Sequence, residues 1–306
     1  EDGPKVGVML PMTGTYAKYG IQLYEGMALA LQETNQKRSE AGLPPVYLAL
    51  RDTGSDARKT VRLYEDFARA GYPVVVGPAA TEEALRLRSP SLEFKVPIVM
   101  PVATGGILTD NGDYLFRNCF SDDMQAKALA EYLHNTLKVD RLAVMIDLDT
   151  NGVYGRTLAH KLSTEFKAAG GEIVQTEGFL NSDIYFSKQL NTMIARKPQA
   201  IFVPANAATA ARLVREARLL GFTGWIVGGD SLAEPEFINR CDRDSGKILF
   251  TSQFSDRLET PEVRDFVKTM LARTGRNPGD CEAQGYDTMK MVLQTLTSDA
   301  PGDFLA

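Results

Sequence analysis

Short apolar runs rich in β-branched residues recur along the chain and alternate with longer segments of helical spacing. Most of these runs are continuously apolar, which is typical of strands buried on both faces of a parallel sheet. The expected strands span residues 6–10, 46–51, 74–77, 97–101, 142–146, 173–176, 200–204, 225–228 and 248–252, and 115–120 is a further strand-like run. The alternation therefore predicts parallel sheets.

The segments between these runs carry apolar residues spaced three and four apart. Helices are expected around residues 24–31, 61–68, 126–137, 158–169, 186–195, 207–220, 261–273 and 281–296. Asp56 precedes the second of them and is the expected N-cap. Strict strand–helix alternation predicts an α/β fold with helices on both faces of each sheet.

The chain has 306 residues, which suits two domains better than one core. The strands are also too many for one comfortable sheet, so we expect two. One boundary is expected near 115–120, where a strand-like run meets the helix start Ser121-Asp122-Asp123, and a second candidate crossing lies at 249–254. Neither place is rich in Pro or Ser, so the connection should be a pair of strands.

Charge and residue counts exclude several function classes. Lys and Arg number 34 and Asp and Glu 39, a net charge of −5, which argues against nucleic acid or an anionic membrane as the main partner. The only histidines, His134 and His160, make a His-based metal or catalytic centre a poor expectation, and no cofactor is expected. No run of 18 apolar residues occurs.

Local motifs of known chemistry are incomplete in this chain. Gly229-Asp230-Ser231-Leu232 matches the four-letter signature of GDSL-type hydrolases, but no His follows Ser231 to act as its base. The acidic clusters 147–149 and 242–244 lack calcium-loop spacing and are expected to be solvated loops. The three cysteines, Cys119, Cys241 and Cys281, form no C-x-x-C pair and are expected to be mostly buried thiols.

Polar residues instead gather where the predicted strands end, which is the edge at which open α/β sheets bind ligands. Thr81 and Thr104 follow two strands of the first half and place a hydroxyl and backbone N–H groups at a helix start, which suits a carboxylate. Tyr154, Asn206 and Asp230 follow three strands of the second half. Such a set could hold a zwitterion; the alternative is that Thr81, Thr104 and Asp230 are ordinary helix caps.

Eight short motifs in order across more than 280 residues resemble the periplasmic branched-chain amino-acid-binding protein family of ABC importers, a type I solute-binding fold. They are Val6–Gly14 with Tyr19-Gly20, Asp52–Asp56, Val76-Gly77 with Thr81, Ile98–Thr104, Phe116-Arg117 with Asp122 and Gln125, Tyr154-Gly155, Arg215–Gly221, and Tyr286-Asp287. The resemblance implies two Rossmann-like lobes joined by hinge strands. Lobe 1 would be discontinuous, with residues 1–117 and 252–296, and lobe 2 would hold 118–251, with 297–306 as a possible addition.

The resemblance also implies a set of ligand residues. In such proteins a hydroxyl after the third strand and an Ala-Thr loop bind the ligand carboxylate and ammonium, tyrosines line both lobes, and an acid pairs with the ammonium. The corresponding residues here are Tyr19, Thr81, Val102, Ala103, Thr104, Tyr154, Asn206 and Asp230.

Two departures bear on the ligand. The acid is Asp230, which is shorter than the Glu of leucine-type members, and Asn206 and Cys281 stand roughly where those members carry aromatic rings. We therefore expect a larger or more polar pocket around the ligand side chain.

The expected function is that of an extracytoplasmic solute-binding protein, which captures a small amino acid-like ligand by hinge closure and delivers it to an ABC transporter permease. It is not expected to be an enzyme. A signal peptide or lipid anchor is expected upstream of the given chain, because the chain opens without Met. The alternatives are the same fold binding an aromatic or short carboxylic acid, and a ligand sensor in place of a transport component.

Overall fold

The computed structural model describes residues 3–109, 112–149, 152–241 and 246–298. The chain divides into two compact units. Of the described residues, unit 1 contains those up to 119 and from 256 onward, and unit 2 contains those from 120 to 255. The units divide between 119 and 120 and between 255 and 256, whereas the sequence placed the crossings at 117–118 and 251–252. Residues 297 and 298 lie in unit 1, and residues 299–306 fall outside the described residues.

Unit 1 is built on a five-stranded, wholly parallel sheet with the order β2-β1-β3-β4-β5. The strand β1 lies between two others, which explains its apolar sequence, since Val8 pairs with Leu50 on one side and Val76 on the other. The strands are β1 (Lys5–Leu10), β2 (Tyr47–Asp52), β3 (Val75–Val76), β4 (Ile98–Met100) and β5 (Leu115–Arg117).

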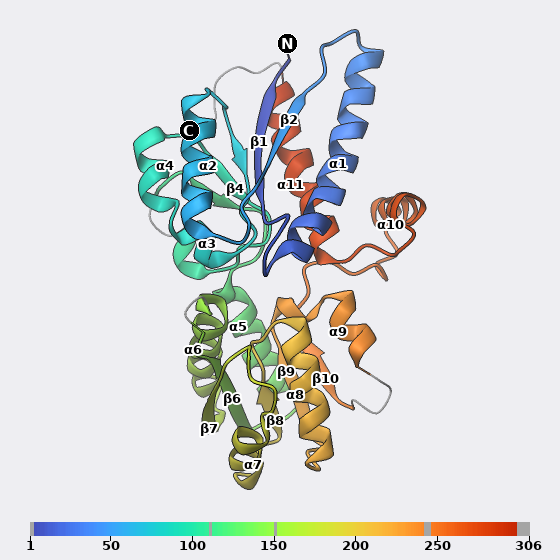
Figure 1. The fold of residues 1–306 in the computed structure, drawn as a ribbon. Helices are drawn as coiled ribbons and strands as arrows, with labels where there is room; N and C mark the ends of the chain where they lie inside the picture. Colours follow the sequence, from blue (N-terminus) through green and yellow to red (C-terminus); the bar gives the residue numbers. More distant parts are fainter. Residues whose placement is uncertain (1–2, 110–111, 150–151, 242–245, 299–306) are drawn as a thin grey trace. The chain divides into compact units, whose positions relative to one another are not determined.

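Helices cover both faces of this sheet (Figure 1). One face carries α1 (Ala17–Glu40) and α11 (Asp280–Thr297), and the other carries α2 (Ala57–Arg69), α3 (Thr81–Leu85) and α4 (Arg88–Phe94). Alternate residues of β1 serve the two cores: Val8 packs into the core with α1 and α11, and Met9 packs into the core with α2 and α4. Because side chains alternate between the two faces along a strand, each residue of β1 packs against the helices of one face only.

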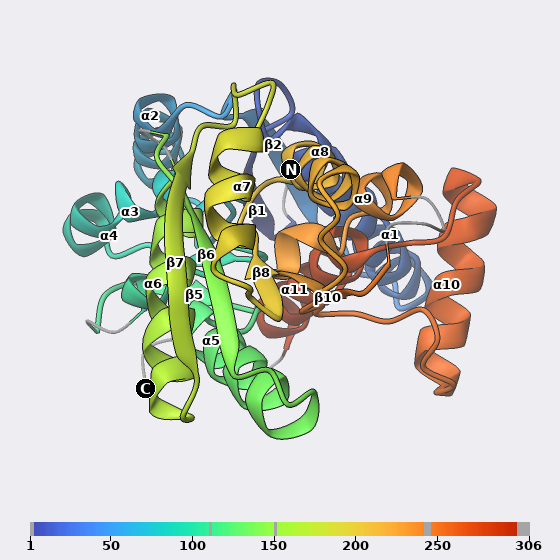
Figure 2. The same cartoon turned by 90° about the horizontal axis from the view of Figure 1, so that it is seen from below.

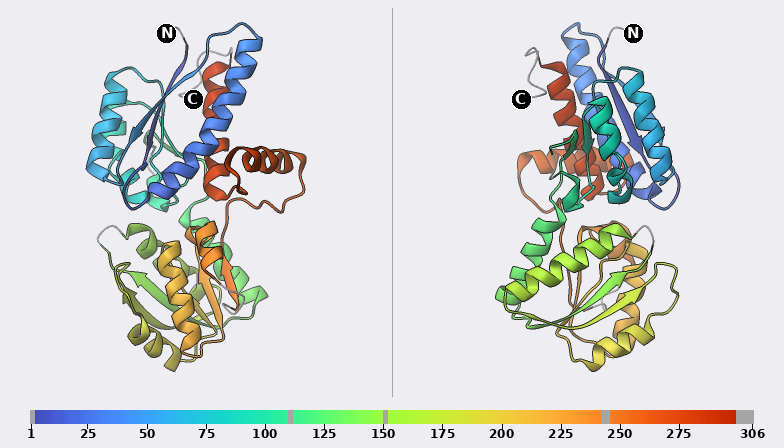
Figure 3. Two further views of the ribbon diagram at one scale, coloured as in Figure 1. Left: turned by 45° about the vertical axis from the view of Figure 1, so that its right-hand side comes forward. Right: turned by 90° about the vertical axis from the view of Figure 1, so that its left-hand side faces the viewer.

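The pair α1 and α11 approaches closely through two glycines. A Cβ added to Gly26 would lie 2.0 Å from the carbonyl oxygen of Glu282, and one added to Gly285 would lie 2.2 Å from that of Leu23. A further helix of unit 1, α10 (Pro261–Thr274), lies beside α11 (Figure 3). The two helices are in contact through the rings of Phe266 and Tyr286, whose centroids are 5.1 Å apart.

Unit 2 repeats the plan with another five-stranded parallel sheet, of order β10-β9-β8-β6-β7. Its strands are β6 (Arg141–Asp147), β7 (Glu172–Phe179), β8 (Ala200–Phe202), β9 (Trp225–Gly228) and β10 (Ile248–Phe250). The edge strands β7 and β10 are less buried than β8 and β6, which accounts for the polar residues within β7.

The helices of unit 2 also lie on both faces of their sheet (Figure 2). On one face α5 (Asp122–Glu131), which continues as a π-helical turn over Tyr132–Thr136, packs beside α6 (Val153–Ala168). The other face carries α7 (Ser187–Ala195), α8 (Ala207–Leu219) and α9 (Pro235–Arg240).

The predicted α/β class with two parallel sheets is confirmed, and the Asp56 side chain caps α2 by accepting from the N–H groups of Arg58 and Lys59. The sequence missed α3, α4 and α9, together with the one-turn 3₁₀ helices η1 (Gly106–Leu108) and η3 (Asp230–Leu232). These segments have seven residues or fewer, too few for a helical apolar period to show. The expectation of mostly buried thiols holds only for Cys281, because Cys119 and Cys241 are partly exposed.

Candidate functional site

In unit 1, the loops after β3 and β4 are joined by a hydrogen bond between a side chain and the backbone. The Gly105 N–H donates to Thr81 Oγ1 over 3.2 Å, and Thr81 is only 4% exposed. Gly105 makes the approach possible, since a Cβ there would lie 2.5 Å from the Thr81 methyl carbon. Thr81 and the loop around Thr104 are therefore linked to each other at the carboxyl edge of the sheet.

The other predicted residues of unit 1 lie at the same edge. Val102, Ala103 and Thr104 follow β4 directly, and Ala103 and Thr104 are almost fully buried. The Ala103 carbonyl accepts from the Cys119 thiol at a sulfur–oxygen distance of 3.6 Å. Tyr19 lies in the first turn of α1, which follows the carboxyl end of β1, and it packs with Val102 against the same core.

The helix-cap alternative is wrong for Thr81, Thr104 and Asp230. The N-cap position of α3 is Ala80, that of η1 is Gly105 and that of η3 is Gly229, and none caps through a side chain. However, α3 has five residues and η1 three, so neither carries the dipole of a long helix. Hydroxyls and individual backbone N–H groups are therefore the donors that this edge can offer a carboxylate.

In unit 2, Asp230 is held by three neutral donors. Its Oδ1 accepts from the Tyr154 hydroxyl at 2.7 Å and from Gln125 Nε2 at 3.2 Å, and its Oδ2 accepts from Gln253 Nε2 at 3.3 Å. Gly229 permits this arrangement, because a Cβ there would lie 2.3 Å from the Tyr154 hydroxyl oxygen. Tyr154 stands in the first turn of α6 and Asp230 directly follows the loop after β9, so both lie at the carboxyl edge of their sheet.

The electrostatics of this group favour a cation. Desolvation raises the pKa of the Asp230 carboxyl above its ordinary value, and the hydrogen bonds from Tyr154, Gln125 and Gln253 oppose that rise. Desolvation and the neighbouring Asp230 charge also raise the pKa of Tyr154, so its phenol remains a donor. Among the described residues no Lys, Arg or His side chain binds Asp230. An ionised carboxylate in such surroundings gains most from a cationic ligand group.

Asn206 is engaged in local structure. Its Oδ1 accepts from the Thr209 N–H at 3.0 Å, which makes it the N-cap of α8, and its Nδ2 donates to Asn181 Oδ1 at 2.8 Å. Asn181 in turn donates to Asp147 Oδ2 at 3.0 Å and Asp149 Oδ2 at 2.7 Å.

The acidic cluster at 147–149 therefore differs from the expected solvated loop. Asp147 is 6% exposed, and desolvation raises the pKa of its carboxyl, whereas the hydrogen bonds from the Asp149 N–H and from Asn181 oppose that rise. The second cluster, at 242–244, lies outside the described residues. Within the described part of the chain, no group of three or more His, Cys, Asp or Glu residues is placed to hold a metal ion.

Sequence reasoning missed two residues of the Asp230 group. Gln253 had no local signal, because it reaches Asp230 from beyond β10. Gln125 belongs to a motif at the crossing, but its sequence position gives no sign of its contacts; its amide binds Asp122, Asp230 and Thr251 at once. Ser231 of the hydrolase signature is not placed as a nucleophile would be, because its hydroxyl donates to the Ala205 carbonyl over 2.9 Å.

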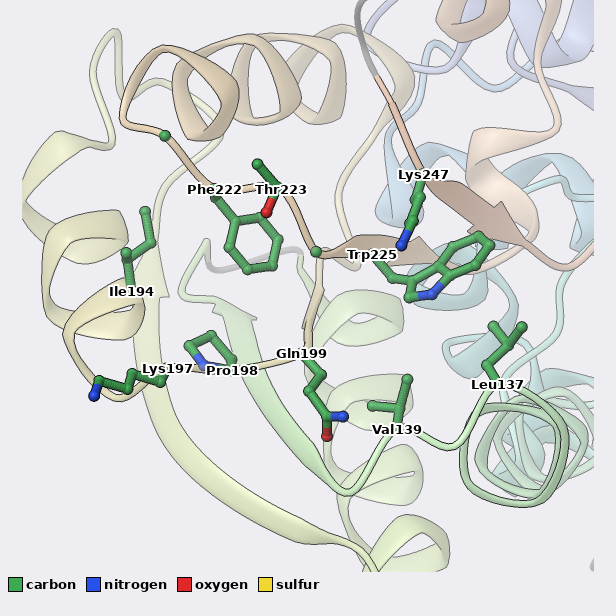
Figure 4. A pocket seen from close by; sticks show the side chains of 12 residues that line it. Leu137, Val139, Ile194, Lys197, Pro198, Gln199, Phe222, Thr223, Trp225 and Lys247 are labelled. Atoms are coloured by element: carbon green, nitrogen blue, oxygen red, sulfur yellow. The ribbon is translucent and has the colours of Figure 1, made fainter.

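A separate pocket opens in unit 2 (Figure 4). It lies beside the amino ends of β8 and β9, at the edge of the sheet opposite to Asp230. Lys197, Gln199, Trp225 and Lys247 are among its lining residues. The Gln199 amide is already bonded to the backbone of residues 138, 140 and 141. This pocket contains none of the predicted ligand residues.

Comparison with known proteins decides the family. The sequence model of the periplasmic binding protein family matches residues 3–303. The chain belongs to this family. This periplasmic binding protein is 28% identical over 269 residues to the Leu/Ile/Val-binding protein BraC3 of Rhizobium johnstonii, an alignment that covers 88% of the chain and 72% of the relative.

Solved structures of similar proteins support the same family assignment. The leucine-binding protein LivK of Thermotoga maritima is 28% identical, with a TM-score of 0.82, over 96% of this chain and 82% of that one. The branched-chain amino acid transporter substrate-binding protein LivJ of Streptococcus pneumoniae, solved with isoleucine, is 27% identical, with a TM-score of 0.86, over 96% and 83%. The resemblance predicted from eight motifs is confirmed, and this periplasmic binding protein is a substrate-binding protein of the ABC importer class.

Family membership implies a place outside the cytoplasmic membrane. The described helices include none that is long and apolar enough to cross a membrane.

Proposed function

We propose that this periplasmic binding protein captures a branched-chain amino acid, with isoleucine and leucine as the first candidates. Asp230 carries the proposal: a desolvated carboxylate held by three neutral donors lacks only a cation, and an amino-acid ammonium supplies one. The relatives named for leucine, isoleucine and valine, and the neighbour solved with isoleucine, support an aliphatic side chain.

In this proposal unit 1 binds the ligand carboxylate. Thr81 and Thr104 offer hydroxyls, the backbone at Val102 and Ala103 offers polar groups, and Tyr19 provides an aromatic wall. Tyr154 and Asp230 of unit 2 bind the ammonium. Because each unit makes only half of the contacts, the ligand stabilises the state in which both reach it, and closure follows from that difference in affinity.

For Asn206 we propose a supporting role. Its amide is committed to the α8 cap and to Asn181, so it shapes the loop after β8 and leaves recognition of the ligand to Tyr154 and Asp230.

We propose that binding is the whole of the activity, with no chemical step. The Ser231 hydroxyl is bound to a backbone carbonyl, and no His follows it in the sequence. The released ligand would pass to an ABC transporter permease, as expected of this class of protein. A leader or lipid anchor encoded upstream would place the protein outside the cytoplasmic membrane.

A thermal-shift screen followed by calorimetry tests the proposed ligand class. A bound ligand raises the midpoint of unfolding in proportion to RT ln(1 + [L]/Kd), so tight ligands stand out. Isoleucine, leucine and valine should each give a shift, and their N-acetyl forms should not, because acetylation converts the ammonium into a neutral amide. A shift with aromatic or short carboxylic acids and none with the amino acids would overturn the proposal.

A further inference from the structure

Arg117, the last residue of β5, binds the loop that follows β4 with nearly its whole guanidinium. Its Nη1 donates to the Thr104 carbonyl at 2.8 Å, and its Nη2 donates to the Gly106 carbonyl at 3.2 Å. Its Nε and Nη2 both donate to Thr109 Oγ1, at 3.2 and 2.6 Å. A planar fork that spans two carbonyls fixes the backbone between them, here at Gly105.

This contact continues toward Thr81. The Thr104 carbonyl and the Gly105 N–H belong to one peptide group and point in opposite directions. A cation at the carbonyl oxygen therefore polarises the N–H that donates to Thr81 Oγ1. Because the Thr81 oxygen accepts this bond, its own proton is left to donate, and none of the hydrogen bonds found among the described residues uses that proton.

A second feature of Arg117 is that, within the described part of the chain, its positive charge is not balanced by a neighbouring acid. Among the residues that the structure describes, no Asp or Glu side chain binds its guanidinium. Arg88 offers a direct contrast: it also donates to this loop, at the Ile107 carbonyl, but its Nε forms an ion pair with Asp113 Oδ2 at 3.1 Å. The same loop thus receives one neutralised cation and one that is not neutralised.

We propose that Arg117 is a positioning residue that makes unit 1 selective for a carboxylate. It holds the 104–109 loop in shape and directs positive charge through the Thr104 peptide to the Thr81 hydroxyl. The inference rests on the proposed function in one respect: that unit 1 binds the carboxylate of the ligand. Arg117 itself touches the loop and not the ligand.

The test compares two probes, L-isoleucine and L-isoleucinamide, which differ only in the carboxylate. Affinities are measured by calorimetry, with the amide also measured by displacement at millimolar concentration. R117Q should weaken isoleucine by about tenfold or more and isoleucinamide by much less, so the preference for the acid falls. The matched control R88Q, which loses a contact to the same loop but no unpaired charge, should leave that preference unchanged.

Two further variants keep the cation and serve if R117Q fails to fold. R117K retains the positive charge but lacks the planar guanidinium, and T109V removes the hydroxyl that accepts two hydrogen bonds from the guanidinium. Both should lower the affinity for isoleucine while keeping more of the preference for the acid than R117Q does.

The proposal is overturned if R117Q weakens both probes by the same factor, if it changes neither, or if R117K loses the preference as fully as R117Q. Failure of the proposed function gives a different result, because the wild-type protein would then bind neither isoleucine nor its amide.

Discussion

The Tyr154 hydroxyl donates to Asp230 Oδ1 over 2.7 Å and thereby links the first turn of α6 to the loop after β9. The phenol is held in its protonated form by desolvation and by the negative charge beside it, both of which raise its pKa. Asp230 is therefore kept as a hydrogen-bond acceptor with fixed orientation. A ligand ammonium that arrives at this carboxylate meets a group whose geometry is already set.

The first prediction concerns the charge of Asp230. D230N keeps the shape of the side chain and removes its charge, so isoleucine binding should weaken by about tenfold or more, as expected for a lost charge-assisted hydrogen bond. Calorimetry measures the change. D140N, at an exposed acid of the same unit that lies beside His134, is the control and should bind as the wild type does. If D230N and the wild type bound isoleucine equally well, the ligand ammonium could not be bound by Asp230.

The second prediction is the pH dependence of binding. The pKa of Asp230 is raised in the unliganded protein, and an ammonium lowers it in the complex, so binding requires loss of a proton when Asp230 is protonated. Affinity should therefore rise with pH until the pKa of the free protein is passed and then level off. Below that pKa it should fall by up to about tenfold for each pH unit. The D230N variant should lack this dependence, and the same slope in D230N would assign it to another group.

The third prediction concerns Thr81. T81V removes the acceptor for the Gly105 N–H and the hydroxyl proposed for the carboxylate, so isoleucine should bind about 5- to 100-fold more weakly. T81S keeps the hydroxyl and should stay close to the wild type. Calorimetry on both variants distinguishes the contribution of the hydroxyl to affinity from that of the methyl group. If T81S lost as much affinity as T81V, packing of the methyl group and not hydrogen bonding would account for the loss.

The fourth prediction concerns Gly229. An alanine Cβ would lie 2.3 Å from the Tyr154 hydroxyl oxygen and 2.6 Å from a Leu158 methyl carbon, so G229A should displace Tyr154 and weaken binding together with a loss of about 1–3 kcal/mol of stability. In the control G221A nothing lies within 4 Å of the new Cβ, and only the left-handed backbone (φ 83°) is strained. G221A should therefore lower the melting temperature and leave affinity intact. Normal affinity in G229A would show that Tyr154 adapts.

Much of the fold follows from the sequence because its signals are local. Continuous apolar runs such as Ala200–Phe202 identify buried parallel strands, and Thr81 and Asp230 can be placed at the binding edge because strand ends share one side of a parallel sheet. Asn206 also carries a local signal for helix capping, because it directly precedes a helix and is a preferred N-cap residue, and its contact with the ligand stays a prediction.

Other features depend on contacts between distant segments. Gln253 and Gln125 converge on Asp230 from separate parts of unit 2, and Arg117 binds a loop 8 to 13 residues away. A single sequence carries no periodic pattern for such contacts. The residues that hold the binding groups in place were therefore identified only from the structure.

The most direct test of the account is a calorimetric titration of the wild-type protein, freed of any bound ligand by unfolding and refolding, with L-isoleucine. We expect saturable binding of one isoleucine per chain that is lost when the ammonium is acetylated. No heat of binding with isoleucine, leucine or valine, together with saturable binding of an aromatic acid, would contradict the assignment of Asp230 and the proposed ligand class.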